Sequence, residues 1–335
     1  MTGRIAVAPM MDVTDRHFRY LIRQISRRAT LYGEMLTTGA VLRGDRARLL
    51  GFSPVEHPVA LQLGGDDPAA LAECAAIGAE VGYDEVNLNC GCPSERVAAG
   101  SFGAVLMRTP ERVGAAVAAM RRSAGVPITV KHRIGVDDLD TYAHLTRFVD
   151  TVREAGAERV VVHARIALLN GISPAQNRTI PPLRYADVYR LKAERPDFPI
   201  DINGGIRTLD EVALHLRHVD GAMIGRAVAE DPWLFAEVDR RFHNEGGPGP
   251  DRAEVARRMG AYAAQGGFGP GFKTHHALRH LLPLFVGLPG ARRWRRALTE
   301  GFAAGVAPVE LVELALVHVS GLTAERLDLS ERGQA

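Results

Sequence analysis

The sequence contains few cysteines, few aromatic residues and no long apolar run. Cys74, Cys90 and Cys92 are the only cysteines in 335 residues, which is too few for a disulfide framework and typical of a reducing compartment. No apolar stretch approaches the roughly 20 residues of a membrane-spanning helix, and the first apolar run, residues 5–8, is too short for a signal peptide. We therefore expect a cytoplasmic protein that does not enter a membrane.

Metal-binding patterns are equally scarce. Cys90 and Cys92 are separated by one residue, and no nearby histidine or cysteine completes a tetrahedral zinc site. The acidic cluster 137–140 precedes a helical pattern, and acidic residues are typical of a first helical turn. The Gly-rich run 266–271 follows no predicted strand, so it does not match a nucleotide-binding fingerprint. We expect no metal site.

Short apolar or β-branched runs alternate with helical patterns through the first two thirds of the chain. The runs are residues 5–8, 31–35, 59–63, 85–89, 128–131, 160–163, 200–203 and 222–225. Eight such units predict parallel strands closed into an α/β (β/α)₈ TIM barrel. A doubly wound open sheet is the alternative, but it would usually carry a Gly-rich turn after its first strand. This chain has residues 9–12, Pro-Met-Met-Asp, at that place.

In such a barrel the active site is built from the residues that follow the strands. Here these positions hold mostly polar residues or glycines. They are Pro9 and Met10, Glu34, Gln62, Asn89 with Cys92, Lys131, His163, Asn203 with Gly204 and Gly205, and Gly225 with Arg226. We expect amide, ammonium, imidazole, guanidinium and thiol groups to converge on one pocket.

The strand-end residues indicate the kind of ligand. The glycines after the last two strands, with Arg226, fit a phosphate group. Lys131 would place a positive charge beside an anion that develops on a bound ring, and His163 would add a further donor. Gln62 would pair with the edge of a heterocycle. Together they favour a phosphorylated heteroaromatic cofactor, and FMN fits that description best.

Cys92 lies in the run 87–94, where a strand-like segment ends at two cysteines, a glycine and a proline. Gly91 permits a close approach of backbone to ligand, and Pro93 stops the strand. A thiol on such a turn is within reach of a reacting molecule, so Cys92 is a candidate acid or nucleophile. A buried structural cysteine is the alternative interpretation.

The last third of the chain differs in pattern and charge. The run 244–250 is a predicted linker between a barrel domain, 1–243, and a helical bundle domain, 251–326, and we expect a disordered tail at 327–335. Helical patterns cover 253–264, 275–285, 293–303 and 308–320. Residues 251–300 hold nine Lys and Arg against three Asp and Glu, although the whole chain carries only +2. Arg292, Arg295 and Arg296 share one helix face, which suits nucleic-acid phosphates; a solvated helix start is the alternative.

A series of short motifs runs in order through nearly the whole chain. They are residues 8–12, 14–17, 57–65, 87–89, 91–94, 130–135, 163–165, 177–183, 203–206, 225–226 and 287–296. The set resembles the tRNA-dihydrouridine synthase family, most closely its A subfamily. Two positions depart from that pattern: Cys90 stands where an apolar residue is usual, and Val13 where tryptophan is common.

The resemblance implies an FMN-dependent, NADPH-driven enzyme that reduces the C5–C6 double bond of uridine in the tRNA D-loop, at positions 20 and 20a. It implies hydride transfer from flavin N5 to C6 and proton transfer from Cys92 to C5. The cofactor-binding residues it implies are Pro9, Met10, Met11, Gln62, Lys131, His163, Asn203, Gly204, Gly205, Gly225 and Arg226. The RNA-facing residues it implies are Asn89, Arg178, Arg292, Arg295 and Arg296. We expect a monomer that binds tRNA and NADPH.

Two other functions stay open from the residues alone. An FMN-barrel reductase of a free pyrimidine base or nucleotide would not need the basic helical domain. A tRNA-binding or chaperone module without catalysis would not need the strand-end residues. We regard dihydrouridine synthesis as the function that uses both parts of the chain.

Overall fold

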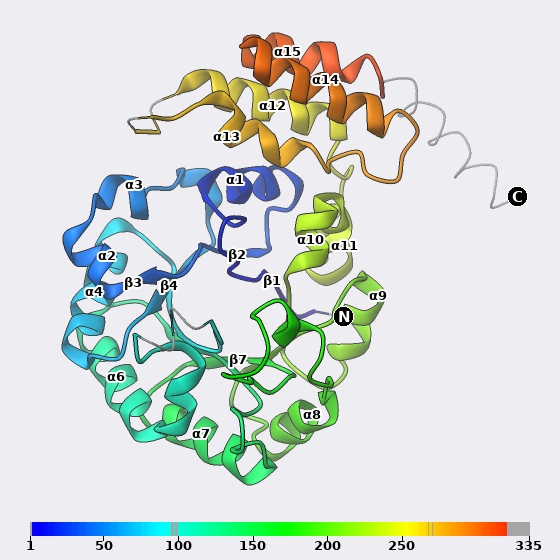
Figure 1. The fold of residues 1–335 in the computed structure, drawn as a ribbon. Coiled ribbons are helices and arrows are strands. Elements are labelled where there is room, and N and C mark those ends of the chain that lie inside the picture. The colour runs from blue at the N-terminus through cyan, green and yellow to red at the C-terminus, as the bar shows by residue number, and fades with distance from the viewer. Residues whose placement is uncertain (1, 95–96, 98–99, 267, 270, 320–335) are drawn as a thin grey trace, which may run out of the picture.

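The computed structural model describes residues 2–94, 97, 100–266, 268, 269 and 271–319, and its first part is a closed parallel barrel (Figure 1). Nine strands form one sheet, and the pairing of β2 with β4 closes a ring of eight, with the two-residue β3 added at the edge of β4. The strands are β1 Arg4–Val7, β2 Thr30–Tyr32, β3 Leu36–Thr37, β4 Val59–Gly64, β5 Glu85–Cys90, β6 Ile128–Arg133, β7 Arg159–His163, β8 Ile200–Asn203 and β9 Gly221–Ile224. The predicted (β/α)₈ barrel is confirmed.

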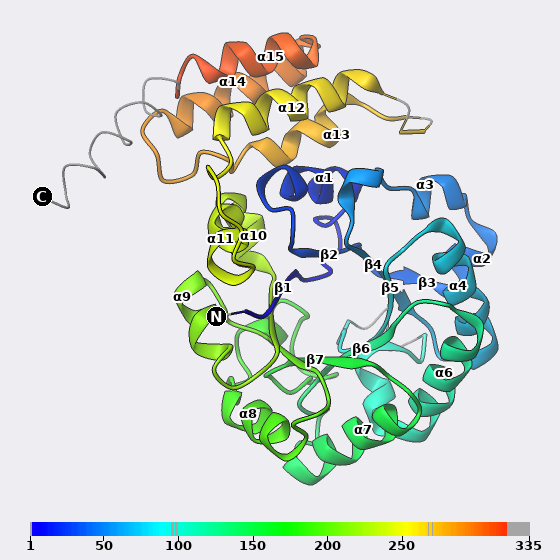
Figure 2. The same ribbon diagram turned by 180° about the vertical axis from the view of Figure 1, so that it is seen from behind.

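Helices surround the ring of strands and shield its outer face from solvent (Figures 1 and 2). They are α1 Arg16–Ile25, α2 Thr38–Arg43, α3 Arg46–Leu50, α4 Pro68–Val81, α6 Pro110–Ser123, α7 Tyr142–Glu154, α8 Tyr185–Glu194, α9 Leu209–His215, α10 Arg226–Glu230 and α11 Val238–Phe242. Local sequence sets their ends. The Asp67 side chain caps α4 at Ala69 N–H, Pro68 opens its first turn, and Gly82 ends it at φ +103°.

Strand alternation divides the barrel into a polar interior and an apolar outer layer. On β5, Glu85, Asn87 and Asn89 make hydrogen bonds inside the barrel. Leu88 and Cys90 alternate with them, belong to the hydrophobic core and are fully buried. Cys90 is therefore a packing residue on the opposite face from the interior side chains.

Helices α12 Arg252–Gln265, α13 Thr274–Leu278, α14 Ala291–Ala304 and α15 Pro308–Leu316 pack on one another beside α1 (Figures 1 and 2). Trp294 is fully buried at their centre, and its Nε1 donates to the Leu281 carbonyl at 2.9 Å. The helix predicted over 275–285 is wrong in length, because α13 ends at Leu278 and a 3₁₀ turn, η5 Arg279–Leu281, follows. The tail predicted at 327–335 lies outside the described residues, as do 320–326.

Two sets of contacts join these helices to the barrel. Asp15, the N-cap of α1, pairs with Arg279 at 2.8 Å and with His280 at 3.0 Å. Burial alone would raise the pKa of the Asp15 carboxyl, but the contact with His280 and the Phe18 N–H outweigh it and lower the pKa. His17 Nδ1 lies 3.0 Å from the Tyr262 hydroxyl. Burial lowers the pKa of His17 to about 4, so this ring is neutral near pH 7.

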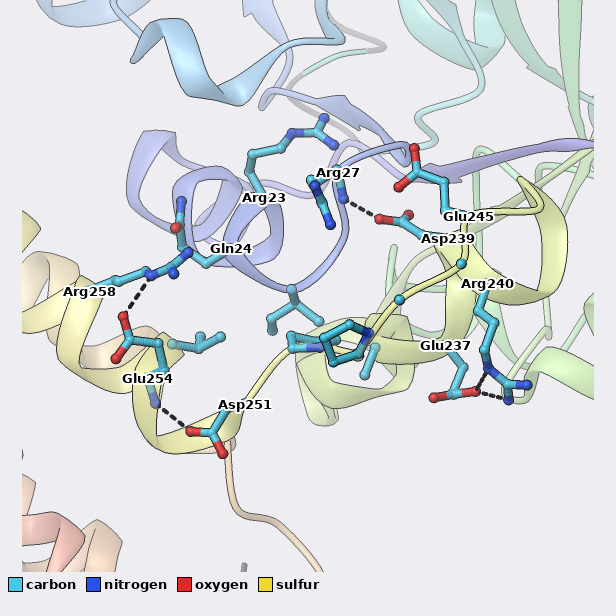
Figure 3. A pocket seen from close by; sticks show the side chains of 18 residues that line it. Arg23, Gln24, Arg27, Glu237, Asp239, Arg240, Glu245, Asp251, Glu254 and Arg258 are labelled. Carbon is cyan, nitrogen blue, oxygen red and sulfur yellow. Dashed lines mark hydrogen bonds and ion pairs between the residues drawn. The ribbon is translucent and has the colours of Figure 1, made fainter.

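A polar cavity of about 480 Å³ lies elsewhere along the boundary between the barrel and these helices, between α1, α11 and the start of α12 (Figure 3). Residues 243–251 pass along it without helix or strand. Asp239 accepts hydrogen bonds from the Ser26 hydroxyl and from the Arg27 N–H, both at 2.6 Å. Arg28 pairs with Glu245, so the segment between α11 and α12 is held against the end of α1.

Candidate active site

The C-terminal ends of the strands form one face of the barrel, here called the barrel mouth, and most predicted site residues meet there. Gln62 on β4 accepts from Asn89 on β5 at 2.8 Å. Lys131 on β6 donates to Asn203 at the end of β8 at 3.1 Å. Two side-chain hydrogen bonds at the mouth therefore join β4 to β5 and β6 to β8.

Cys92 lies on the segment directly after β5, residues 91–94, here called the cysteine turn. Asn89 Oδ1 accepts the backbone N–H groups of Gly91 and Cys92, both at 3.0 Å. The Cys92 carbonyl accepts from Ala104 at 2.9 Å, and the thiol lies 3.6 Å from the Ser94 hydroxyl. Cys92 is half-buried, whereas the other two cysteines are buried. It is thus the cysteine that a ligand at the mouth can reach.

Two cations from β6 flank the cysteine turn. Burial, together with the charge of Arg133, lowers the pKa of Lys131 to about 7. Burial also lowers the pKa of Arg133 to about 10, and a negative charge on Cys92 would oppose that shift. A negative charge at Cys92 would therefore favour the charged forms of both side chains.

Arg133 is a site residue that strand-end reasoning missed, although it is part of the 130–135 motif. Its Nε donates to the Gly91 carbonyl at 2.9 Å, and its Nη1 donates to the carbonyls of Ile166 and Asn177 at 2.8 and 2.9 Å. It joins the cysteine turn to the loop after β7, which carries Arg178. Arg133 comes two residues after Lys131 and therefore lies on the same strand face, and this spacing could have identified it from the sequence.

His163 and two glycines line the side of the mouth formed by β7 and β8. Gly204 and Gly205 have φ values of +110° and +75°. A Cβ on Gly204 would lie 2.5 Å from His163 Cδ2, and one on Gly205 would lie 2.6 Å from Leu183 Cδ1. Burial and the nearby cations hold the pKa of His163 well below its usual range, so the ring is neutral at pH 7. Only glycine fits both the backbone conformation and the space at these two positions.

The loop after β1 carries Pro9, Met10 and Met11. Thr14 Oγ1 accepts the Met10 N–H at 2.9 Å, while Met11 is exposed. Asp12 has φ +64°, an unusual conformation for a residue other than glycine, and its N–H donates to Glu34. Met10 Sδ lies near Gly225, where an added Cβ would be 3.6 Å away. The β1 loop and the β9 end are therefore adjacent at the mouth.

The arginines predicted to face RNA lie in two places. Arg178 is exposed at the mouth, and its carbonyl accepts from exposed Arg226 at 3.2 Å. Arg292 and Arg295 are exposed on α14 and line a second cavity of about 600 Å³ with Arg293 and His318. Arg296 pairs with Glu300 at 2.6 Å. Asn89, also predicted to face RNA, is buried beneath Cys92 and is 8% exposed.

Within the described ranges, no group of three His, Cys, Asp or Glu side chains is arranged to hold a metal ion. Of the helices in that part of the chain, none has the length and apolar character needed to cross a membrane.

Comparison with known families agrees with this arrangement. The model of the dihydrouridine synthase family matches residues 6–319, which is nearly the whole chain. The chain belongs to this family. A tRNA-dihydrouridine(20/20a) synthase from Synechocystis sp. is 53% identical over 312 residues, covering 93% of each chain. A protein of the same name from Xanthomonas axonopodis pv. citri is 52% identical, covering 93% of each chain. Another from Escherichia coli K12 is 48% identical, covering 95% of this chain and 92% of its own length.

Proposed function

We propose that this chain reduces uridine to 5,6-dihydrouridine in tRNA, at positions 20 and 20a of the D-loop. The observation that carries the proposal is the half-buried Cys92 thiol at the barrel mouth, flanked by Lys131 and Arg133. Membership of the dihydrouridine synthase family and the names of the relatives support the reaction and the substrate.

The residues at the mouth fit a bound flavin. Gly204 and Gly205 have positive φ and no room for a Cβ beside His163 and Leu183, so only backbone lies there and it can approach a phosphate group closely. Lys131 supplies an ammonium whose hydrogen-bond partner among the described residues is the neutral amide of Asn203. The residues that would hold FMN are Pro9, Met10, Met11, Gln62, Lys131, His163, Asn203, Gly204, Gly205, Gly225 and Arg226. When bound and reduced by NADPH, FMN supplies the hydride that is added to C6 of the uracil ring.

Cys92 supplies the proton at C5 in this proposal. Proton transfer needs the donor atom within hydrogen-bond reach of the accepting carbon, and the cysteine turn presents the thiol at the mouth. Loss of the proton would leave a negative charge on Cys92, which would favour the charged forms of Lys131 and Arg133. The hydrogen bonds from Asn89 and Arg133 to the turn keep the thiol in place.

RNA binding is assigned to two surfaces. Arg178 would contact the target nucleotide at the mouth, and Arg292, Arg295 and Arg296 would contact phosphates farther along the tRNA. Asn89, predicted to face RNA, is instead buried with its amide bonded to Gln62 and to the N–H groups of Gly91 and Cys92. We assign the barrel to residues 1–243, a linker to 244–250 and the tRNA-binding helical domain to 251–326. The enzyme would act as a monomer in the cytoplasm.

The proposal is tested with purified protein, NADPH and an unmodified tRNA transcript. We expect a yellow protein with bound FMN that forms dihydrouridine at positions 20 and 20a, detected by mass spectrometry of nuclease fragments. Free uridine and uracil serve as alternative substrates and should react far more slowly. A colourless protein, or one that prefers the free base, would contradict the proposal.

A further inference from the structure

A continuous series of side-chain hydrogen bonds runs from the cysteine turn into the barrel. Asn89 Oδ1 accepts the Cys92 N–H at 3.0 Å, and Asn89 Nδ2 donates to Gln62 Oε1 at 2.8 Å. Gln62 Nε2 donates to Asn87 Oδ1 at 2.7 Å. Asn87 Nδ2 then donates to Thr129 Oγ1 at 2.8 Å. All four of these side chains are buried.

The series ends at the carboxylate of Glu85, the first residue of β5 and therefore at the end of the barrel opposite the mouth. The hydroxyls of Thr129 and Tyr32 both donate to one Glu85 oxygen, and Arg159 pairs with the other. The carboxylate is thus surrounded by donors on both oxygens. We call the set Asn89, Gln62, Asn87, Thr129 and Glu85 the interior chain.

The two ends of the interior chain determine the direction of every hydrogen bond between them. The N–H groups of Gly91 and Cys92 can only donate, so the Asn89 oxygen must face them. The carboxylate of Glu85 accepts, so the Thr129 hydroxyl must donate to it and accept from its other neighbour. Each amide in between has one orientation that suits both neighbours. Rotating one amide by 180° would place two donors or two acceptors against each other in a buried site. Each unpaired group would then cost roughly 1–3 kcal/mol.

We propose that Thr129 and Glu85 are positioning residues for Cys92, acting through the interior chain. Neither residue lies at the mouth, and neither would touch substrate or cofactor. Their hydrogen bonds keep Asn87 and Gln62 in the one orientation that lets Asn89 hold the cysteine turn. A change at Thr129 therefore reaches the thiol through three buried amides. The effect on catalysis rests on the proposed function, whereas the effect on the position of the thiol does not.

The test removes the Thr129 hydroxyl, which links the three amides to Glu85. Thr129→Val leaves the ion pair of Glu85 with Arg159 in place, so it breaks the chain without unpairing a buried charge. Thr129→Ser restores the hydroxyl. Thr151→Val is a matched control on α7, where the hydroxyl donates to the Arg147 carbonyl at 2.8 Å.

Two quantities are measured on each purified holoprotein. The first is the rate at which iodoacetamide alkylates Cys92, followed by mass spectrometry; Cys74 and Cys90 are buried and should stay unmodified. The second is the kcat and KM for dihydrouridine formation in tRNA. For Thr129→Val we expect alkylation about threefold faster, because the turn is held less firmly, and a kcat about tenfold lower at unchanged KM. Thr129→Ser and Thr151→Val should stay close to wild type.

An alkylation rate that is unchanged or slower in folded Thr129→Val protein would overturn the proposal. Alkylation needs no turnover, so the two hypotheses fail separately. If alkylation is faster in Thr129→Val but the wild-type protein itself makes no dihydrouridine, the positioning role is upheld and the proposed function is contradicted. If Thr129→Val does not fold, Thr129→Ala removes the same hydroxyl, leaves the Glu85–Arg159 pair in place and is judged by the same two measurements.

Discussion

Lys131 Nζ donates to Asn203 Oδ1 at 3.1 Å, which joins β6 to β8 over the intervening β7. Asn203 is itself fixed, because its Nδ2 donates to the Met223 carbonyl at 2.7 Å. The ammonium is thus held in place by a neutral amide, while burial and the charge of Arg133 lower its pKa to about 7. Such a cation is positioned to pair with an anionic ligand.

The lowered pKa predicts a pH dependence of stability in protein from which flavin has been removed. The Lys131 pKa falls from its ordinary 10.5 to about 7 in the folded chain. Between these two pH values the unfolded chain binds the extra proton, so this residue makes stability rise as pH increases. Below pH 7 the folded protein carries the full unfavourable contribution of a buried charge.

Lys131→Met removes this contribution. The difference in melting temperature, Lys131→Met minus wild type, should therefore be largest at pH 6 and should decrease toward pH 9. Thermal unfolding at pH 6, 7.5 and 9 measures the difference. A difference that does not vary with pH would show that Lys131 is fully charged in the folded protein throughout this range.

Gly204→Ala should reduce flavin binding. The added Cβ would lie 2.5 Å from His163 Cδ2, and the residue would keep φ +110°. Gly171→Ala is the matched control, because Gly171 also has positive φ, +85°, but has no atom within 4 Å of an added Cβ. Both variants carry backbone strain of about 1–3 kcal/mol. The flavin-to-protein ratio after purification should fall in Gly204→Ala alone. An equal ratio in the two variants would contradict the role of Gly204 in binding flavin.

Arg292→Ala/Arg295→Ala should weaken tRNA binding and make it less dependent on salt. Each lost phosphate contact lowers the slope of log Kd against log salt by about one, so the double variant should lose about two. Exposed Arg122 on α6 and exposed Arg217, two residues after the end of α9, provide a double-alanine control of equal charge. Binding to labelled tRNA is measured from 50 to 300 mM KCl, roughly the range in which such slopes are determined. Equal slopes in the two double variants would place the RNA elsewhere.

The sequence was sufficient to predict the barrel, because eight apolar runs end in polar or glycine residues and each closes one βα unit. Alternation also places Cys90 on the core face of β5 with Leu88. Cys92 has the same parity, so it is separated from Cys90 only by the end of the strand, which Gly91 and Pro93 predict. Strand ends alone did not reveal Asn87 and Thr129, which lie inside strands. Their roles depend on pairing in register with neighbouring strands, Gln62 with Asn87 and Asn87 with Thr129.

Contacts between segments far apart in the sequence could likewise not be predicted from local sequence patterns. Asp15 is recognisable as an N-cap residue from its position before α1. Its partners, Arg279 and His280, are more than 260 residues away, and only the folded chain brings them together. The same holds for Arg133, whose hydrogen bonds to the Ile166 and Asn177 carbonyls require the loop after β7 to cross the mouth.

The central claim is that Cys92 donates the proton to the uracil ring, and Cys92→Ala tests it most directly. Cys90→Ala is the control, since it removes a neighbouring thiol that faces the hydrophobic core. We expect Cys92→Ala to retain FMN and to oxidise NADPH as wild type does, while dihydrouridine formation in tRNA falls by about 100-fold or more, as is typical for loss of a general acid. Dihydrouridine formed by Cys92→Ala at the wild-type rate would contradict the account.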